Sequence, residues 1–291
     1  MKHNYLNNRD ILKEIHKSKS TYCSFLTPED GFYDIILPSV DKINKKNTVE
    51  GRKLRAERLG RAAYDAAQAA TTEKLRLDDF SVKPSKIADT DVVFRIMTWD
   101  HIPADTSKKK KAAVDDDAVI TEYDDSIEIV TPTKYTKVNF PPFKHYRLNE
   151  EGKPYCVGHS HWQGDLETGV FCKDHGTMTK KLAHMFMKLC ERYATRSNWR
   201  GYTYNDEMRS QALLQLSQIG LQFDESKSQN PFAYYTAAIT NSFTRVLNIE
   251  KRNQNLRDDI LEMNGLTPSY TRQGQGSWGG GGAPSGDFVD D

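Results

Sequence analysis

The sequence predicts a mainly α fold, in which a helical bundle carries a mixed α/β, partly disordered insertion. Three helical patterns follow one another between residues 179 and 256, joined by two short polar turns. Short apolar runs and a linker of opposite charge blocks precede them. A Gly-rich, acidic stretch follows them. We therefore expect four parts: a docking helix at 1–26, an insertion at 27–176, a helical domain at 177–257 and a flexible tail at 258–291.

The charge is divided unevenly along the chain. Overall it is only +1, but residues 177–257 hold 12 Lys/Arg against 6 Asp/Glu, a net charge of +6. Residues 258–291 hold 1 Arg against 6 acids, a net charge of −5. A basic helical block indicates a nucleic-acid partner, and an acidic tail indicates a different one. The N-terminus is polar and no run of 18 apolar residues exists, so we expect no signal peptide, no membrane span and four reduced cysteines.

The first helix is expected within residues 1–26. Asn7 or Asn8 can serve as its N-cap, and Ile11, Leu12 and Ile15 form one apolar face. Because so short a helix is not stable alone, it must dock on another part of the chain.

The insertion is predicted to contain a helix, short strands, a linker and a hairpin. The helix covers 49–70, with a weak apolar stripe through Leu54, Leu59 and Tyr64. A strand covers 91–99, and the charged linker covers 103–138. A β-hairpin is expected over 155–172, with its turn at Gly164 or near Gly169.

Two Cys/His pairs in this hairpin raise the question of zinc. The residues are Cys156, His159, Cys172 and His175. Zinc accepts both side chains in such close pairs, but the order is not that of a standard finger. Structural histidines and buried cysteines also explain the pattern, so both interpretations stay open, and no other cofactor is indicated.

The helical block has clear internal signals. The first helix begins near Thr179 and presents one continuous apolar face, formed by Leu182, Met185, Phe186, Leu189 and Tyr193. The second begins near Thr203 and turns Met208, Ala212 and Leu216 inward.

The third helix begins at Asn230-Pro231, an N-cap followed by proline at the first helical position. Phe232, Tyr235, Ile239, Phe243 and Val246 can pack inward. Aromatic residues at its start and basic ones such as Lys251 and Arg252 toward its end are typical of a protein that binds separated DNA strands.

Three segments carry a family resemblance: NYLNNRDILKEI near the N-terminus, then RYATRSNWRGYTYNDEM and GLQFDESKSQNPFAYYTAAITNSFTRVLNIEKRN. The run from Leu182 to Arg252 resembles region 2 of bacterial sigma factors. It is most similar to the late-transcription sigma factors of T-even-type phages, in the long form of relatives that infect cyanobacteria. The resemblance implies a sigma region 2-like helical domain interrupted by an insertion. The function of that insertion is not assigned by the sequence.

The resemblance implies a protein with no active site of its own. It would bind the host bacterial RNA polymerase core in the cytoplasm of the infected cell and direct initiation at AT-rich late promoters. By position, Glu207, Ser210, Gln211 and Leu214 would meet the polymerase. Phe232, Tyr234 and Tyr235 would capture flipped-out bases, and Asn241 and Arg245 would contact the DNA duplex.

Two departures from primary sigma factors stand out. Ala238 and Ile239 lie near the positions of their tandem tryptophans, and no helix-turn-helix domain follows Leu256. Late sigma factors share the second lack and depend on a phage co-activator and the phage sliding clamp. The tail end, with Asp287, Phe288 and Val289, resembles their clamp-binding epitope. The alternatives are a zinc-binding nucleic-acid-binding protein and a polymerase-binding regulator that does not read promoters.

Overall fold

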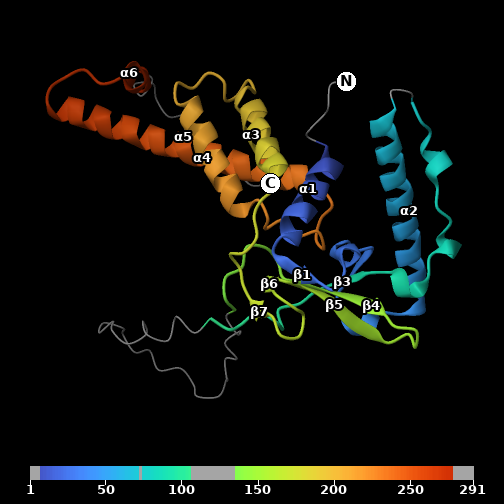
Figure 1. Cartoon of the computed structure of the whole chain (residues 1–291). Helices are drawn as coiled ribbons and strands as arrows, with labels where there is room; N and C mark the ends of the chain where they lie inside the picture. Colours follow the sequence, from blue (N-terminus) through green and yellow to red (C-terminus); the bar gives the residue numbers. More distant parts are fainter. Residues whose placement is uncertain (1–6, 72–73, 106–134, 278–291) are drawn as a thin grey trace, which may run out of the picture. The chain divides into compact units, whose positions relative to one another are not determined.

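The computed structural model describes residues 7–71, 74–105 and 135–277 (Figure 1). Helices of all kinds make up about half of the structure, and a five-stranded mixed sheet accompanies them. The predicted combination of helices with a mixed α/β part is therefore correct at this level, although the sheet is larger than the sequence indicated. None of the helices in the described ranges is long and apolar enough to cross a membrane.

The chain forms two compact units. Of the described residues, those within Met1–Met187 and Ser217–Tyr235 make up the first, and those within Lys188–Leu216 and Thr236–Asp291 the second. The boundaries fall inside three helices, α3 (Lys180–Ala194), α4 (Asn205–Ile219) and α5 (Pro231–Met263). The described part of the predicted insertion belongs to the first unit together with the N-terminal helix, so the contacts do not separate it as a domain.

The first unit is built on the five-stranded sheet, whose strand order is β1-β5-β4-β3-β2. The strands are β1 (Cys23–Phe25), β2 (Ile35–Leu37), β3 (Phe94–Met97), β4 (Phe143–Leu148) and β5 (Pro154–Ser160). Of the neighbouring pairs in this sheet, only β2 and β3 are parallel. Leu37, Val92, Phe94 and Ile96 form a buried cluster around this pair, and the strand predicted at 91–99 is confirmed as β3. Short 3₁₀ turns cover Pro28–Gly31, Val40–Lys42, Leu77–Phe80, Pro84–Lys86 and Asp89–Asp91.

The hairpin predicted over 155–172 is only partly correct. Residues 154–160 pair with β4 and β1 instead, as a strand of the main sheet. The expected turn at Gly164, with φ of 95°, joins only β6 (Trp162–Gln163) to β7 (Val170–Phe171). His161 lies between β5 and β6 with φ of 54°, a left-handed conformation that ends the first strand.

Helix α2 (Lys45–Ala70) exists as predicted, but its predicted packing face is wrong. Leu54 and Leu59 are about 40% exposed, whereas Gly51, Ala56 and Gly60 are buried. A Cβ on Gly51 would lie 2.5 Å from Val92 Cγ1, and one on Gly60 would lie 2.6 Å from the Phe80 carbonyl oxygen. Small residues are buried here because neighbouring chain segments approach the helix backbone closely, a requirement of size and not of hydrophobicity.

Helix α1 (Asn8–Ser20) is the docking helix that the sequence predicts. Asn7 is its N-cap and accepts a hydrogen bond from the Arg9 N–H, and Ile11 and Ile15 are fully buried. At the other end of the helix, Ser18 Oγ accepts from the Thr179 N–H (3.0 Å) just before α3. Two segments 161 residues apart are thereby joined within the first unit.

The second unit has an aromatic core. Tyr193 and Trp199 both meet Phe243 of α5 edge-on, at centroid distances of 5.5 and 5.3 Å. Asn205 Nδ2 donates to the carbonyl oxygens of Ala194 and Trp199, which fixes the turn between α3 and α4. The predicted apolar faces of α3 and α4 are confirmed by the burial of their members: Leu182, Met185, Phe186, Leu189, Tyr193, Met208, Ala212 and Leu216.

The prediction that regular structure ends at residue 257 is wrong. Helix α5 continues to Met263 and the chain turns back into α6 (Tyr270–Ser277) (Figure 1). Gly265, with φ of 68°, donates to Glu262 O, and Leu266 donates to Leu261 O, which together form a Schellman C-cap. Asn264-Gly265 and the following Pro268 were the sequence signals of this helix end. Residues 278–291, including the predicted clamp-binding residues Asp287, Phe288 and Val289, lie outside the described residues.

Candidate nucleic-acid interface

The first turn of α5 carries the three aromatic residues assigned to base capture. Asn230 Oδ1 accepts from the Ala233 N–H (3.1 Å), which confirms the predicted N-cap. Tyr235 is fully buried, donates its hydroxyl to Gly220 O (2.6 Å) and meets the Phe186 ring at 4.8 Å. A ring enclosed in this way cannot stack on a base. The assignment of Tyr235 to DNA is therefore wrong, because its side chain is part of the core.

Phe232 and Tyr234 are only half-buried. The Tyr234 ring lies edge-on to Phe223 at 5.5 Å and to Tyr235 at 5.2 Å, so its position is held by two aromatic neighbours. The Phe232 N–H donates to Asn8 Oδ1 (3.0 Å), which ties the first turn of α5 to α1. Two of the three aromatic candidates thus keep part of their surface exposed on a fixed backbone.

Further along α5, within the second unit, a polar row lies on the exposed side of the helix. Its members are Asn241, Arg245, Asn248 and Arg252, and all four are exposed. Spacings of four, three and four residues place them on one helix face. Ile239, Phe243 and Val246 are buried and hold the helix from another side. Sequence reasoning missed Asn248, although its spacing of three residues from Arg245 and four from Arg252 indicated that it shares their helix face.

This part of α5 is also basic. Residues 241–257 contain four Lys/Arg and one Asp/Glu, a net charge of +3. Lys251, another predicted DNA-binding residue, is exposed next to the row. Arg and Asn side chains contact both phosphate oxygens and base edges, and Lys supplies a further positive charge for phosphate. The row therefore has the chemistry of a nucleic-acid-binding helix face.

Helix α4 carries the residues assigned to the polymerase. Glu207, Ser210 and Leu214 are exposed and Gln211 is intermediate. Leu214 exposes 52% of its surface. On the other side of the helix Met208, Ala212 and Leu216 are completely buried. The four candidates thus form a rigidly supported polar surface with one apolar centre.

The chain matches no protein-family model, no characterised protein and no solved structure.

The proposed zinc ligands make other contacts. His159 stacks on His101 with a centroid distance of 5.5 Å, and burial lowers its pKa to about 4. His175 Nδ1 lies 3.0 Å from the Cys172 carbonyl oxygen, and Cys156 Sγ lies 3.6 Å from that of Gly158. Within the described ranges, no three His, Cys, Asp or Glu side chains are grouped so that they could hold a metal ion.

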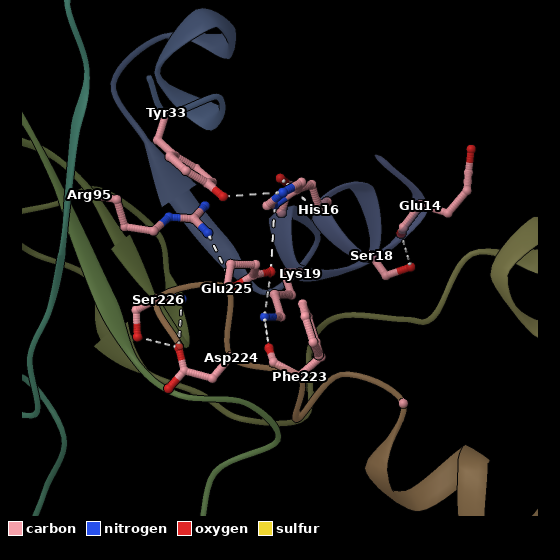
Figure 2. Close-up of polar contacts among 12 residues, drawn as sticks. Glu14, His16, Ser18, Lys19, Tyr33, Arg95, Phe223, Asp224, Glu225 and Ser226 are labelled. Carbon is pink, nitrogen blue, oxygen red and sulfur yellow. Dashed lines mark hydrogen bonds and ion pairs between the residues drawn. The ribbon is translucent and has the colours of Figure 1, made fainter. Parts of the chain in front are cut away.

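Sequence reasoning missed a buried charge cluster in the first unit, which we call the Glu225 cluster: His16, Lys19, Tyr33, Arg95 and Glu225 (Figure 2). Lys19 Nζ lies 2.8 Å from Glu225 Oε1 and donates to Phe223 O (2.7 Å). Arg95 Nη1 lies 3.8 Å from Glu225 Oε2. Lys19 comes from α1, Arg95 from β3 and Glu225 from the segment that leads into α5, so one carboxylate joins three distant parts of the chain.

Aromatic rings and a histidine complete the surroundings of Arg95. Its guanidinium carbon lies 3.9 Å from the Tyr33 ring centroid and 3.8 Å from that of Phe143. Arg95 Nε donates to His145 Nε2 (2.9 Å), while His145 Nδ1 donates to Asp30 O (2.6 Å). A carbonyl only accepts, so the neutral Nδ1–H tautomer of His145 is defined. Burial and the adjacent Arg95 hold the pKa of His145 well below its usual value.

The charges in the Glu225 cluster support one another. Burial by itself would raise the pKa of Glu225, but Lys19 and Arg95 outweigh it and lower that pKa to about 2. Burial lowers the pKa of Lys19, and its ion pair with Glu225 opposes that shift. In the sequence, this cluster was indicated by Lys19, a lysine on the apolar side of α1 four residues after the buried Ile15.

Proposed function

We propose that this protein is a specificity factor of the sigma type, which binds bacterial RNA polymerase core and directs it to AT-rich late promoters of a phage. The observation that carries the proposal is the exposed row of Asn241, Arg245, Asn248 and Arg252 on α5. These residues lie on a helix whose buried side is fixed by aromatic packing. Their side chains donate hydrogen bonds, and the phosphate oxygens and base edges of duplex DNA accept them.

The start of α5 supports a role in strand separation. Phe232 and Tyr234 keep part of their surface exposed and are held in place by neighbouring rings and a backbone hydrogen bond. Each base that stacks on such a ring contributes about 1–3 kcal/mol, comparable to the few kcal/mol that unstacking a base costs. Two rings offset part of that cost, and we propose that a co-activator and the sliding clamp supply the rest.

The polymerase-binding surface is proposed for α4. Leu214 is an exposed apolar side chain surrounded by polar ones, Glu207, Ser210 and Gln211. This arrangement of an apolar centre with a polar rim is typical of protein–protein interfaces. The clamp contact through Asp287, Phe288 and Val289 is proposed from the sequence alone.

Reconstituted transcription tests the proposal. The protein is mixed with core polymerase of the host and a negatively supercoiled AT-rich late promoter, and a pre-melted template serves as a second substrate. We expect specific initiation from the mixture and none from either protein alone. Absence of a specific transcript on both templates would exclude the sigma function, because the pre-melted template removes the cost of strand separation.

A further inference from the structure

The end of α5 carries an apolar row that is open to solvent among the described residues. Ile249, Leu256, Ile260 and Met263 expose 47%, 59%, 51% and 86% of their surface. At 100° per residue their side chains leave the helix within about 60° of one another. Val246, which is only 5% exposed, lies at the edge of this row, about 40° around the helix from Ile260. The seam by which α5 packs inside the second unit therefore runs on for about four more turns into solvent.

The spacing of this row is that of a coiled coil. Val246, Asn253 and Ile260 occupy heptad positions a, and Ile249, Leu256 and Met263 occupy positions d. Asn253 is the one polar member, and a polar residue at an a position lowers the stability of such a pairing while restricting its register.

Helix α6 does not cover the row, because it binds other sides of α5. Asp258 accepts from the Ser269 N–H (2.8 Å) and hydroxyl (2.7 Å) at the start of α6. Arg272 of α6 pairs with Asp259 (2.7 Å) and Glu262 (3.0 Å). These partners lie at least about 70° around the helix from the mean direction of the apolar row. Residues 264–277 thus stiffen the end of α5 while its apolar row remains exposed.

The charged residues that flank the apolar row favour a partner helix with a complementary charge pattern. Glu250 and Arg257 occupy e positions, and Arg252 and Asp259 occupy g positions. When two copies of this helix run antiparallel, Glu250 of each faces Arg257 of the other, and Arg252 of each faces Asp259 of the other. All four contacts join opposite charges. In a parallel pair Arg252 would face Arg257 twice, and these two repulsive contacts would cancel the two favourable contacts of Arg245 with Glu250.

We propose that residues 249–263 of α5 pair with the same segment of a second copy of this chain in an antiparallel coiled coil. Ile249 packs against Ile260 of the second copy, and Asn253 against its Leu256. The seam is only about 21 Å long and includes a polar residue, so the dimer is weak and reversible. Arg252 belongs both to this seam and to the proposed DNA-binding row, so the dimer occupies part of the DNA-binding face.

Sedimentation equilibrium on the full chain tests the pairing, with concentrations up to about 0.5 mM, where a weak complex of this size is populated. We expect a monomer–dimer equilibrium that the double change Leu256→Asp with Ile260→Asp abolishes. Both residues are exposed, so folding is retained, and unchanged circular dichroism checks this. The matched change Leu59→Asp, at an exposed leucine of α2, leaves the dimer unaffected. A monomer at every concentration would overturn the proposal.

Charge reversal tests the direction. Arg257→Glu places two Glu–Glu contacts in the antiparallel pair and should weaken the dimer about ten-fold. The double change Glu250→Arg with Arg257→Glu restores opposite charges and should recover the affinity of the original chain. In a parallel pair the single change would instead strengthen the dimer, because the introduced carboxylate would then face Arg252. That result would overturn the antiparallel arrangement.

Discussion

Lys19 Nζ lies 2.8 Å from Glu225 Oε1, and the two side chains expose only 2% and 5% of their surface. They are 206 residues apart in the sequence. The lysine comes from the N-terminal helix, and the glutamate from the segment just before α5. A buried ion pair with the N-terminal helix α1 therefore positions the start of α5.

Removing one member of this pair should destabilise the first unit strongly. Lys19→Met leaves the Glu225 carboxylate buried with its nearest cation gone, and we expect a loss of about 3 kcal/mol in the free energy of unfolding. Lys13→Met, at an exposed lysine of the same helix, should change it by less than about 0.5 kcal/mol. Urea denaturation of both variants measures the difference. Equal effects would mean that the pair has no structural role.

The same carboxylate should make stability depend on pH under acid conditions. The pKa of Glu225 falls from 4.5 to about 2 on folding. Its contribution, about 3 kcal/mol, is fully present above pH 4.5 and is lost as pH falls toward 2. Glu225→Gln should remove this part of the pH dependence, and Glu167→Gln, at an exposed carboxylate, should leave it unchanged. Denaturation curves between pH 5 and pH 2 for all three proteins would show whether the acid-labile step is absent only in the Glu225 variant.

The two neighbouring tyrosines of α5 should respond differently to substitution. Tyr234→Ala should weaken binding to AT-rich forked DNA about ten-fold, because one stacking surface is removed. Tyr235→Phe should leave that affinity unchanged but cost about 1–2 kcal/mol of stability, since the buried Gly220 carbonyl loses its donor. Fluorescence anisotropy and urea denaturation separate the two effects. A loss of DNA affinity in a folded Tyr235→Phe protein would contradict the burial argument.

The polar row of α5 should account for the affinity for DNA. Arg245→Ala should weaken binding about five- to ten-fold and reduce its salt dependence by about one ion. Arg257→Ala provides the matched control, because it removes the same charge from the same helix on a different side. It should have a clearly smaller effect. If the two changes were equivalent, the binding would reflect net charge and not this helix face.

An exposed leucine should be important for polymerase binding. Leu214→Asp places a charge at the apolar centre of the α4 surface and should lower the affinity for core polymerase at least about ten-fold, without a change in stability. Leu54→Asp, at an exposed leucine of α2, is the control. Binding of labelled protein to core polymerase measures both. An unaffected Leu214→Asp variant would remove α4 from the proposed interface.

Local patterns predicted the helices well. The row from Leu182 to Tyr193, the caps at Asn7 and Asn230 and the buried side of α4 were all expected and are all present. Such features are visible in sequence because helical periodicity and capping involve residues only a few positions apart. The overlooked continuation of α5 past residue 257 also had a local signal, the glycine of its Schellman cap.

The sequence by itself therefore determined the helices, their caps and the basic character of α5. Tertiary structure alone decided that the glycine side of α2 is buried and that the apolar row at the end of α5 faces outward. For Tyr235, it decided between the inward packing and the base contact, both of which the sequence indicated. It also decided the pairing of Lys19 with Glu225. The physical reason is distance along the chain. Periodicity reports which residues share a helix face, but only long-range packing determines what that face meets.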